Sequence, residues 1–193
     1  MSRIAELDVN HACLILITVN AYLQRLPPLS FFKGMSVNLK LNKSYPLSEL
    51  LLTLENGGYF RTDTVREAGE FAVRGGIIDI FPAGRDEPLR LDFFGDELES
   101  VKRFDPITQR SIDSIEAAKL SPVAEIILNS ESINRFKSSY REAFGAKASN
   151  DQIYQTIAEG RYYVGMEHWL PFFYSRLDTL EVYAKSKFVS LDS

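Results

Sequence analysis

The sequence has few of the residues that build disulfides and metal sites. Among 193 residues there is one cysteine, Cys13, and there are two histidines, His11 and His168. A single thiol excludes an internal disulfide framework and fits a reducing compartment. Because Cys13 lies in the apolar run "ACLILITV", we interpret it as a small buried hydrophobe rather than a nucleophile. Two histidines exclude a His-rich metal site.

Positive charge is also scarce. The chain has 22 Lys and Arg against 26 Asp and Glu, which gives a formal net charge of -4. A protein whose affinity depends on phosphate contacts usually shows the opposite balance. The composition therefore disfavours nonspecific nucleic-acid binding, although it allows a local basic patch. No apolar run is long enough to cross a membrane and the opening residues do not form a signal peptide, so we expect a cytoplasmic protein without a membrane partner.

Motifs of the common enzyme classes are missing too. The sequence has no G-x-x-x-x-G-K-[ST] loop for a nucleotide, no G-x-S-x-G, no zinc-type histidine pair and no Cys-x-x-Cys. His168 follows Glu167, a pairing that can form a general base, but no nucleophile stands nearby. Asp79 is a lone carboxylate in an apolar stretch, and we interpret it as the partner of a backbone group or an arginine. We therefore predict no catalytic residue, no metal and no cofactor in this chain.

The residues that are present predict a folded protein whose secondary structure changes along the chain. With 45% hydrophobic and 12% aromatic residues, it can bury a core. Residues 13–19 are continuously apolar, which predicts a strand covered on both faces, followed by a short helix that ends before Pro27. Residues 187–193 resemble a second strand. Either the two strands pair with each other, or they belong to a larger α/β domain, which is the explanation we favour.

Residues 36–122 predict a small α+β domain. Alternation over 36–41 predicts a half-buried strand, and a helix follows with Ser48 as N-cap and Gly57 or Gly58 as C-cap. The segment "GIIDIFP" is apolar at nearly every position and predicts the central strand of a largely antiparallel sheet. From residue 123 onward helices predominate. The longest covers residues 130–144, with Ser130 as N-cap and Gly145 as its end.

One strand of this domain carries an unusual polar face. In "LRLDFFG" the leucines alternate with Arg90, Asp92 and Phe94, so these three side chains should share a face. Arg74 lies on a neighbouring predicted strand, and Arg61 precedes that strand in the sequence. Aromatic side chains ringed by arginines are typical of protein-binding hot spots. Exposed arginines are also common, and Phe94 could cover a helix packed on that face, so both interpretations stay open on the pattern alone.

A longer segment is similar to a known module. "GGYFRTDTVREAGEFAVRGGIIDIFPAGRDEPLRLDFFGDELESVKRFDPITQRS" resembles the second domain of bacterial transcription-repair coupling factors. The same module in UvrB has the pattern G-Y-x-R-x-D, then G-x-F-x-V-R-G-x-x-I-D-I-F-P. The flanks "ILITVNAYLQRLPP" and "GMEHWLPFFY" are similar to the coupling factors as well. The resemblance implies three parts: 1–35 ends the first half of a degenerate NTPase-like domain, 36–122 is a UvrA-binding module, and 123–193 begins the second half.

This resemblance implies a non-catalytic interaction region that recruits UvrA to stalled transcription complexes for nucleotide excision repair. The family is an ATP-driven DNA translocase, and its motor domains, which use ATP and Mg and reach RNA polymerase and DNA, would be absent here. The family also implies that its own C-terminal domain masks the UvrA-binding face until activation. The alternative is a nucleic-acid-binding module of a DNA repair protein, because arginines and aromatic residues also bind single strands.

The resemblance assigns specific residues. The family's UvrA contacts fall on Arg74, Arg90 and Phe94, which lie on the strip that alternation identifies. A further UvrB arginine corresponds to Arg61, whereas another falls on Ala72, so that contact should be missing or replaced. Asp92 is expected to pair with a basic group of UvrA or to hold Arg90 in place.

Overall fold

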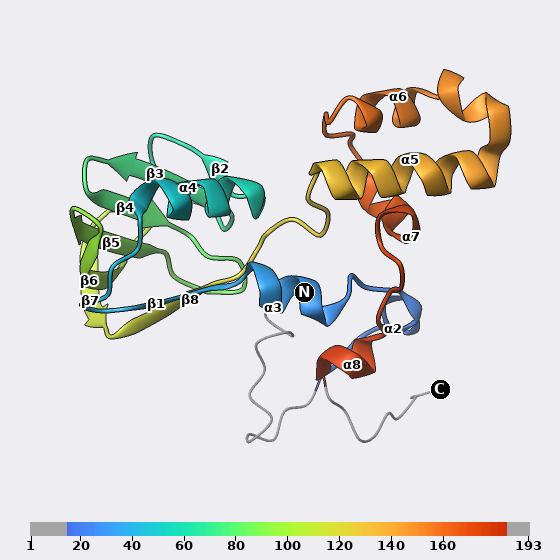
Figure 1. Ribbon diagram of the computed structural model, residues 1–193. Coiled ribbons are helices and arrows are strands. Elements are labelled where there is room, and N and C mark those ends of the chain that lie inside the picture. The colour runs from blue at the N-terminus through green and yellow to red at the C-terminus, as the bar shows by residue number, and fades with distance from the viewer. Residues whose placement is uncertain (1–14, 185–193) are drawn as a thin grey trace. The chain divides into compact units, whose positions relative to one another are not determined.

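The computed structural model describes residues 15–184, except for the side chain of residue 146. Cys13, the first two residues of the expected strand 13–19 and the expected strand 187–193 lie outside the described residues. Within that range the chain divides into two compact units. One consists of residues 32–124, and the other combines residues 15–31 with residues 125–184. Figure 1 shows the helices and strands of both units.

The first unit is built on a six-stranded sheet with the order β2-β3-β4-β5-β6-β7. Its strands are β2 (Phe60–Arg61), β3 (Glu70–Arg74), β4 (Ile77–Ile80), β5 (Leu89–Phe94), β6 (Glu97–Phe104) and β7 (Ser111–Ile115). Strands β2 and β3 run parallel, and every other neighbouring pair is antiparallel. β4 lies inside the sheet, as the sequence predicts. The predicted α+β class is confirmed.

One face of this sheet carries the main core of the unit. Helix α4 (Leu47–Asn56) lies over it (Figure 1), and the antiparallel pair of β1 (Val37–Lys40) and β8 (Ala117–Leu120) completes it. The apolar side chains that alternate along the strands meet there, including Leu89, Leu91 and Phe93 of β5. Removing such side chains from water stabilises the fold by about 1.5–3 kcal/mol each.

The predicted N-cap of α4 is wrong. The helix begins at Leu47, with Pro46 at the N-cap position and no side-chain bond from that residue. The Leu47 N–H instead donates to Oδ1 of Asp96 at 3.0 Å, from the turn between β5 and β6. A helix end needs some acceptor for its first N–H groups, and here a residue distant in sequence supplies one. The predicted C-cap at Gly57 is confirmed.

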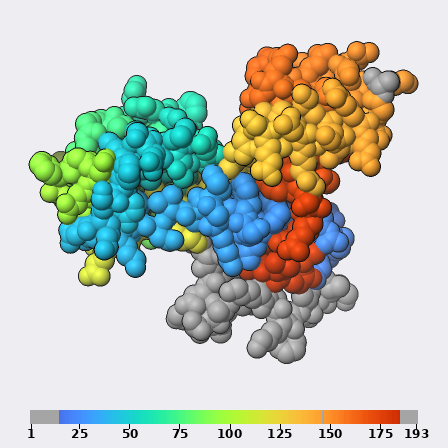
Figure 2. Space-filling view, in the orientation of Figure 1, coloured from blue at the N-terminus to red at the C-terminus, as the bar shows by residue number. Residues whose placement is uncertain are grey.

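Helices make up the second unit. They are α2 (Val19–Leu23), α5 (Ser130–Phe144), η1 (Gly145–Asn150), α6 (Gln152–Ala158), η2 (Met166–Trp169), α7 (Leu170–Phe173) and α8 (Leu180–Ala184), while α3 (Leu29–Met35) spans the division between the units. α5 and α6 lie in contact, as the orange surface of Figure 2 shows. Between them and α7 lies an aromatic core that includes Phe136, Tyr140, Tyr154 and Phe173.

The longest helix differs by one residue from its prediction at the start. Its N-cap is Asn129, not Ser130. The Asn129 side chain accepts the Ser132 N–H at 2.8 Å, and Oγ of Ser132 accepts the Asn129 N–H at 3.0 Å. This reciprocal pair satisfies two N–H groups at once, which one serine at position 130 would not do. Gly145 ends the helix at a φ of 62°, as predicted.

The expected strand over residues 13–19 is wrong for its described part. Residues 15–18 have no regular structure, and α2 already begins at Val19. Leu16 is 84% exposed. The Thr18 side chain accepts the Ala21 N–H at 3.2 Å and caps the helix. A strand needs a neighbour for its N–H and C=O groups, and no described strand lies beside these residues.

The two sequence segments of the second unit are joined through Asp178. Leu26 and Asp178 exchange two backbone hydrogen bonds of 2.9 Å, and Oδ2 of Asp178 accepts the Leu29 N–H at 2.8 Å. The Tyr183 hydroxyl donates to the Pro27 carbonyl at 2.6 Å. Residues 26–29 are therefore held by residues about 150 positions further along the chain. Across residues 15–184, no helix has both the length and the apolar character that a membrane span needs.

Candidate functional site

The sheet face opposite α4 carries three of the predicted site residues, Arg74, Arg90 and Asp92, in two rows of register partners. Partners in neighbouring strands place their side chains on the same face. The first row consists of Ala72, Asp79, Arg90, Lys102 and Ser114, and the second of Arg74, Ile77, Asp92 and Ser100. We call these two rows, together with Phe94 at the end of β5, the arginine face. A bulge between β5 and β6 places its extra residue, Glu99, on β6, so the alternation along β5 continues to Phe94.

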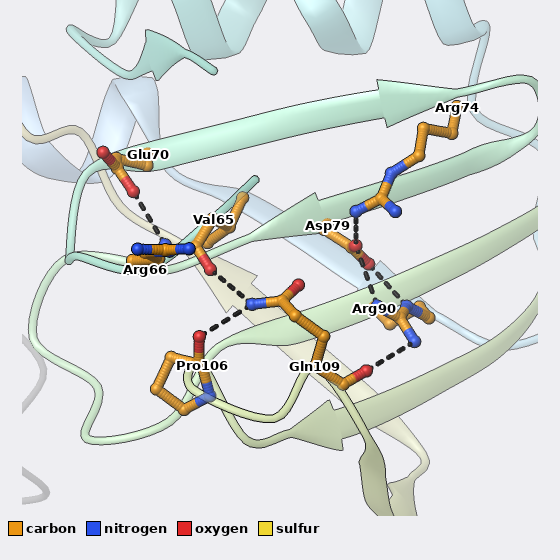
Figure 3. Close-up of polar contacts among 8 residues, drawn as sticks. All are labelled: Val65, Arg66, Glu70, Arg74, Asp79, Arg90, Pro106 and Gln109. Atoms are coloured by element: carbon orange, nitrogen blue, oxygen red, sulfur yellow. Dashed lines mark hydrogen bonds and ion pairs between the residues drawn. The ribbon is translucent and has the colours of Figure 1, made fainter. Parts of the chain in front are cut away.

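Asp79 is the centre of the arginine face. It lies on β4, and only 1% of its side chain is exposed. Its Oδ1 accepts Nε of Arg90 at 2.6 Å, and its Oδ2 accepts Nη2 of Arg90 at 2.9 Å. Oδ2 also accepts Nη2 of Arg74 at 2.9 Å (Figure 3). One buried carboxylate therefore joins arginines from β3 and β5, and their charges offset the cost of burying it.

Arg90 is held at all three of its nitrogen atoms. Besides the two bonds to Asp79, its Nη1 donates to the Gln109 carbonyl at 3.3 Å (Figure 3). Its guanidinium also lies over the Phe104 ring, 4.9 Å from the centroid. The hydrogen bond to Asp79 raises the pKa of Arg90 above its ordinary value, against the opposing effect of burial. Only 23% of the Arg90 side chain is exposed, so most of it is covered within the chain.

Arg74 is held much more loosely. Its Nη2 makes the one bond to Asp79, and 55% of the side chain is exposed. Within residues 15–184, Nε and Nη1 of Arg74 have no hydrogen-bond partner. These nitrogens keep N–H donors, in the plane of the guanidinium, for another molecule.

Phe94 lies at the open end of the arginine face. It is the last residue of β5, and 76% of it is exposed. The turn between β3 and β4 approaches closely here, because the Gly76 carbonyl accepts the Phe93 N–H at 2.9 Å. A Cβ at residue 76 would lie 2.4 Å from the Phe93 carbonyl oxygen, so this approach requires glycine.

The other end of the face is covered by loops. Val65, Ala72 and Phe104 form a small buried cluster with Phe81 packed against it. The loop between β6 and β7 is fixed by Gln109, which has a φ of 62°. The Gln109 side-chain amide donates to the Val65 carbonyl at 3.0 Å and to the Pro106 carbonyl at 2.7 Å (Figure 3). A partner therefore cannot reach position 72, which is 2% exposed.

The structure does not bring Arg61 to the same face. Arg61 on β2 is the register partner of Phe71, whose side chain lies in the main core. The register therefore places Arg61 on the α4 side, away from Arg74 and Arg90. Asp92 does lie on the arginine face, but it does not hold Arg90, which was one of its two expected roles. Asp79 performs that role instead.

Sequence reasoning missed the roles of Asp79 and Gln109. Asp79 has one recognisable signal, a carboxylate within an apolar strand, and either a backbone group or an arginine was expected as its partner. The pattern does not say which arginine, because that depends on the register between β3, β4 and β5. Gln109 acts partly through its backbone carbonyl, which leaves no trace in residue type. Within residues 15–184, no three His, Cys, Asp or Glu side chains gather as they would around a metal ion.

Comparison with known proteins places the chain in a family. A family model described as the UvrB interaction domain matches residues 37–125. The transcription-repair-coupling factor of Escherichia coli strain K12 is 35% identical over 91% of this chain and 15% of its own length. That of Haemophilus influenzae is 34% identical over 93% of this chain and 16% of its length, and that of Rickettsia typhi is 34% identical over 98% and 17%.

The family model covers the sheet of the first unit, and the three relatives also match residues on either side of it. Residues 37–125 thus match the UvrB interaction domain. The chain belongs to the transcription-repair-coupling factor family. It spans 15 to 17% of the length of these three relatives.

Proposed function

We propose that this chain is a protein-interaction region that binds UvrA and brings it to stalled transcription complexes for nucleotide excision repair. Membership of the coupling-factor family and the UvrB interaction domain at residues 37–125 support this proposal. ATP-driven translocation, contacts with RNA polymerase and DNA, and masking by a C-terminal domain would belong to other parts of the family protein.

The observation that carries the proposal is the pairing of exposed Arg74 and Phe94 with a braced Arg90 on one sheet face. Phe94 supplies a rigid aromatic anchor, and such residues dominate binding energies when a partner's pocket buries them. Arg74 supplies a guanidinium for a charge-assisted hydrogen bond to an acidic group of UvrA. The main core lies on the opposite face, so binding needs no rearrangement of it.

Calorimetric titration of the 193-residue chain against UvrA tests the proposal. We expect wild-type binding, and at least about tenfold weaker binding for Arg74→Ala, Arg90→Ala and Phe94→Ala, since about 1.4 kcal/mol is a factor of ten. Arg103→Ala is the matched control, because Arg103 is the register partner of the core residue Leu89 and lies on the α4 side. A wild-type chain that does not bind UvrA would refute the function.

The same samples address the alternative of a nucleic-acid-binding module. A gel shift with single-stranded DNA, repeated across salt concentrations, detects phosphate contacts because these weaken steeply with salt. We expect no shift at physiological salt, given the net charge of -4. Tight, salt-sensitive DNA binding that is lost in Arg74→Ala would favour the alternative.

A further inference from the structure

We propose that Asp79 is a positioning residue on the arginine face. It holds Arg90 in place within the chain and leaves Arg74 as the cation that binds the partner. The partner then supplies a single carboxylate to Arg74, next to an apolar pocket for Phe94. This inference rests on the proposed function, because it describes the chemistry that UvrA presents to this face.

The first step concerns the donors of Arg90. A guanidinium has five N–H donors, and its Nε and Nη2 donate side by side to one carboxylate. Asp79 occupies that edge of Arg90 at 2.6 and 2.9 Å, and the Gln109 carbonyl takes Nη1. With the Phe104 ring beneath its guanidinium, Arg90 is fixed from three directions. The Nε–Nη2 edge, which would meet a partner's carboxylate side by side, is already occupied by Asp79.

The second step concerns the donors of Arg74. Its bond to Asp79 fixes the end of the side chain through Nη2 alone. Nε and Nη1 remain available, and more than half of the side chain is in solvent. Fixing one nitrogen reduces the side-chain entropy that a partner must remove on binding, so the arginine is ready for a second carboxylate.

The third step concerns charge. Arg74 and Arg90 carry two positive charges and Asp79 carries one negative charge, so the trio has a net charge of +1. Lys102 and Asp92, the next charged residues in the two rows, add one charge of each sign and leave this balance unchanged. One partner carboxylate neutralises the face, and a second would lie beside Asp79 without a cation of its own. The balance therefore favours one acidic side chain rather than an acidic cluster.

The central test is Asp79→Asn, which keeps the shape of the side chain and removes its charge. The matched control is Asp113→Asn, because Asp113 receives two bonds from Arg103 on the α4 side in the same type of pair. We expect UvrA binding by calorimetry to weaken about tenfold for Asp79→Asn and to change less than about twofold for Asp113→Asn. In the chain alone, Asp79→Asn should shift the ¹⁵N–¹H signal of Arg90 Nε, and Asp113→Asn should not.

A second pair of variants keeps Asp79 and tests the division of roles between the arginines. Lysine keeps the charge but not the two-pronged geometry. Arg74→Lys should weaken UvrA binding more than Arg90→Lys, because only Arg74 meets the partner's carboxylate. The opposite order would overturn the inference, as would wild-type affinity in Asp79→Asn. Both results leave the proposed function standing, whereas a wild-type chain that fails to bind UvrA overturns both.

Discussion

Asp79 and Arg90 face each other as register partners on β4 and β5 and are joined by two hydrogen bonds of 2.6 and 2.9 Å. The Asp79 side chain of this pair is 1% exposed, whereas 23% of the Arg90 side chain is exposed. The same pair therefore contributes to the stability of the sheet and to the shape of the arginine face. Arg74 bonds to the same carboxylate, but 55% of the Arg74 side chain is exposed. The two arginines should consequently respond differently to substitution.

We predict that Arg90→Ala destabilises the first unit and that Arg74→Ala does not. Removing Arg90 takes away two of the three bonds to a buried carboxylate, a loss that costs about 3 kcal/mol when a buried pair is broken. Removing Arg74 takes away one bond at the exposed side, and the free energy of unfolding should change by less than about 1 kcal/mol. Urea unfolding followed by circular dichroism measures both. Equal losses of stability would contradict the asymmetry.

We predict that Phe94→Ala weakens UvrA binding at least about tenfold and leaves the melting temperature unchanged. The ring is 76% exposed and packs little in the chain alone, so its contribution appears only on binding. The control is Leu52→Ala, since Leu52 is 57% exposed and lies on α4, over the opposite face of the sheet. Calorimetry with UvrA should show near-wild-type affinity for Leu52→Ala. An equal loss of affinity in both variants would indicate nonspecific hydrophobic binding and not a specific contact of Phe94.

We predict that Gly76→Ala destabilises the fold by at least about 1 kcal/mol, because the new Cβ would lie 2.4 Å from the Phe93 carbonyl oxygen. Moving that carbonyl would also displace Phe94, so UvrA affinity should fall in the folded fraction. Gly34→Ala is the control, since nothing lies within 4 Å of its added Cβ and alanine is the better helix former in α3. Thermal unfolding should show a lower melting temperature for Gly76→Ala, and a raised or unchanged melting temperature for Gly34→Ala.

A pH dependence is expected in the second unit. Hydrogen bonds from the Thr179 and then the Tyr22 side chains lower the pKa of Glu181 to about 2 from an ordinary 4.5. The folded state therefore binds fewer protons than the unfolded state, so this contribution is present above pH 4.5 and is lost as the pH falls to about 2. Glu181→Gln should flatten the decline of the melting temperature over that window. Glu142→Gln, at an exposed position of α5, should keep the wild-type decline.

Several features of the first unit could be predicted from residue order alone. Alternation along β5 separates core residues from the arginine face, and "IIDI" predicts an inner strand because both its faces are covered. Gly57 and Gly145 end their helices as expected. These features depend on neighbours within a few residues, where the backbone period sets the direction of each side chain.

Features that depend on distant partners could not be predicted. Asp96 replaces Ser48 at the start of α4 through a bond across 49 positions. The expected strand at 13–19 lacks a neighbouring strand for its described residues, and α2 forms from Val19 instead. Arg61 lies on the opposite face from Arg74 because of the parallel register between β2 and β3. Local pattern contains no information on any of these partners.

Residue order is enough to show that Arg90, Asp92 and Phe94 share one face of a strand, since side chains alternate along any β-strand. What each of them does there depends on how the strands pair. The register between β3, β4 and β5 brings one buried carboxylate within reach of two arginines, and that carboxylate holds Arg90 firmly while Arg74 and Phe94 stay exposed. A hydrogen bond requires atoms about 3 Å apart, and strand register, not residue order, sets that distance.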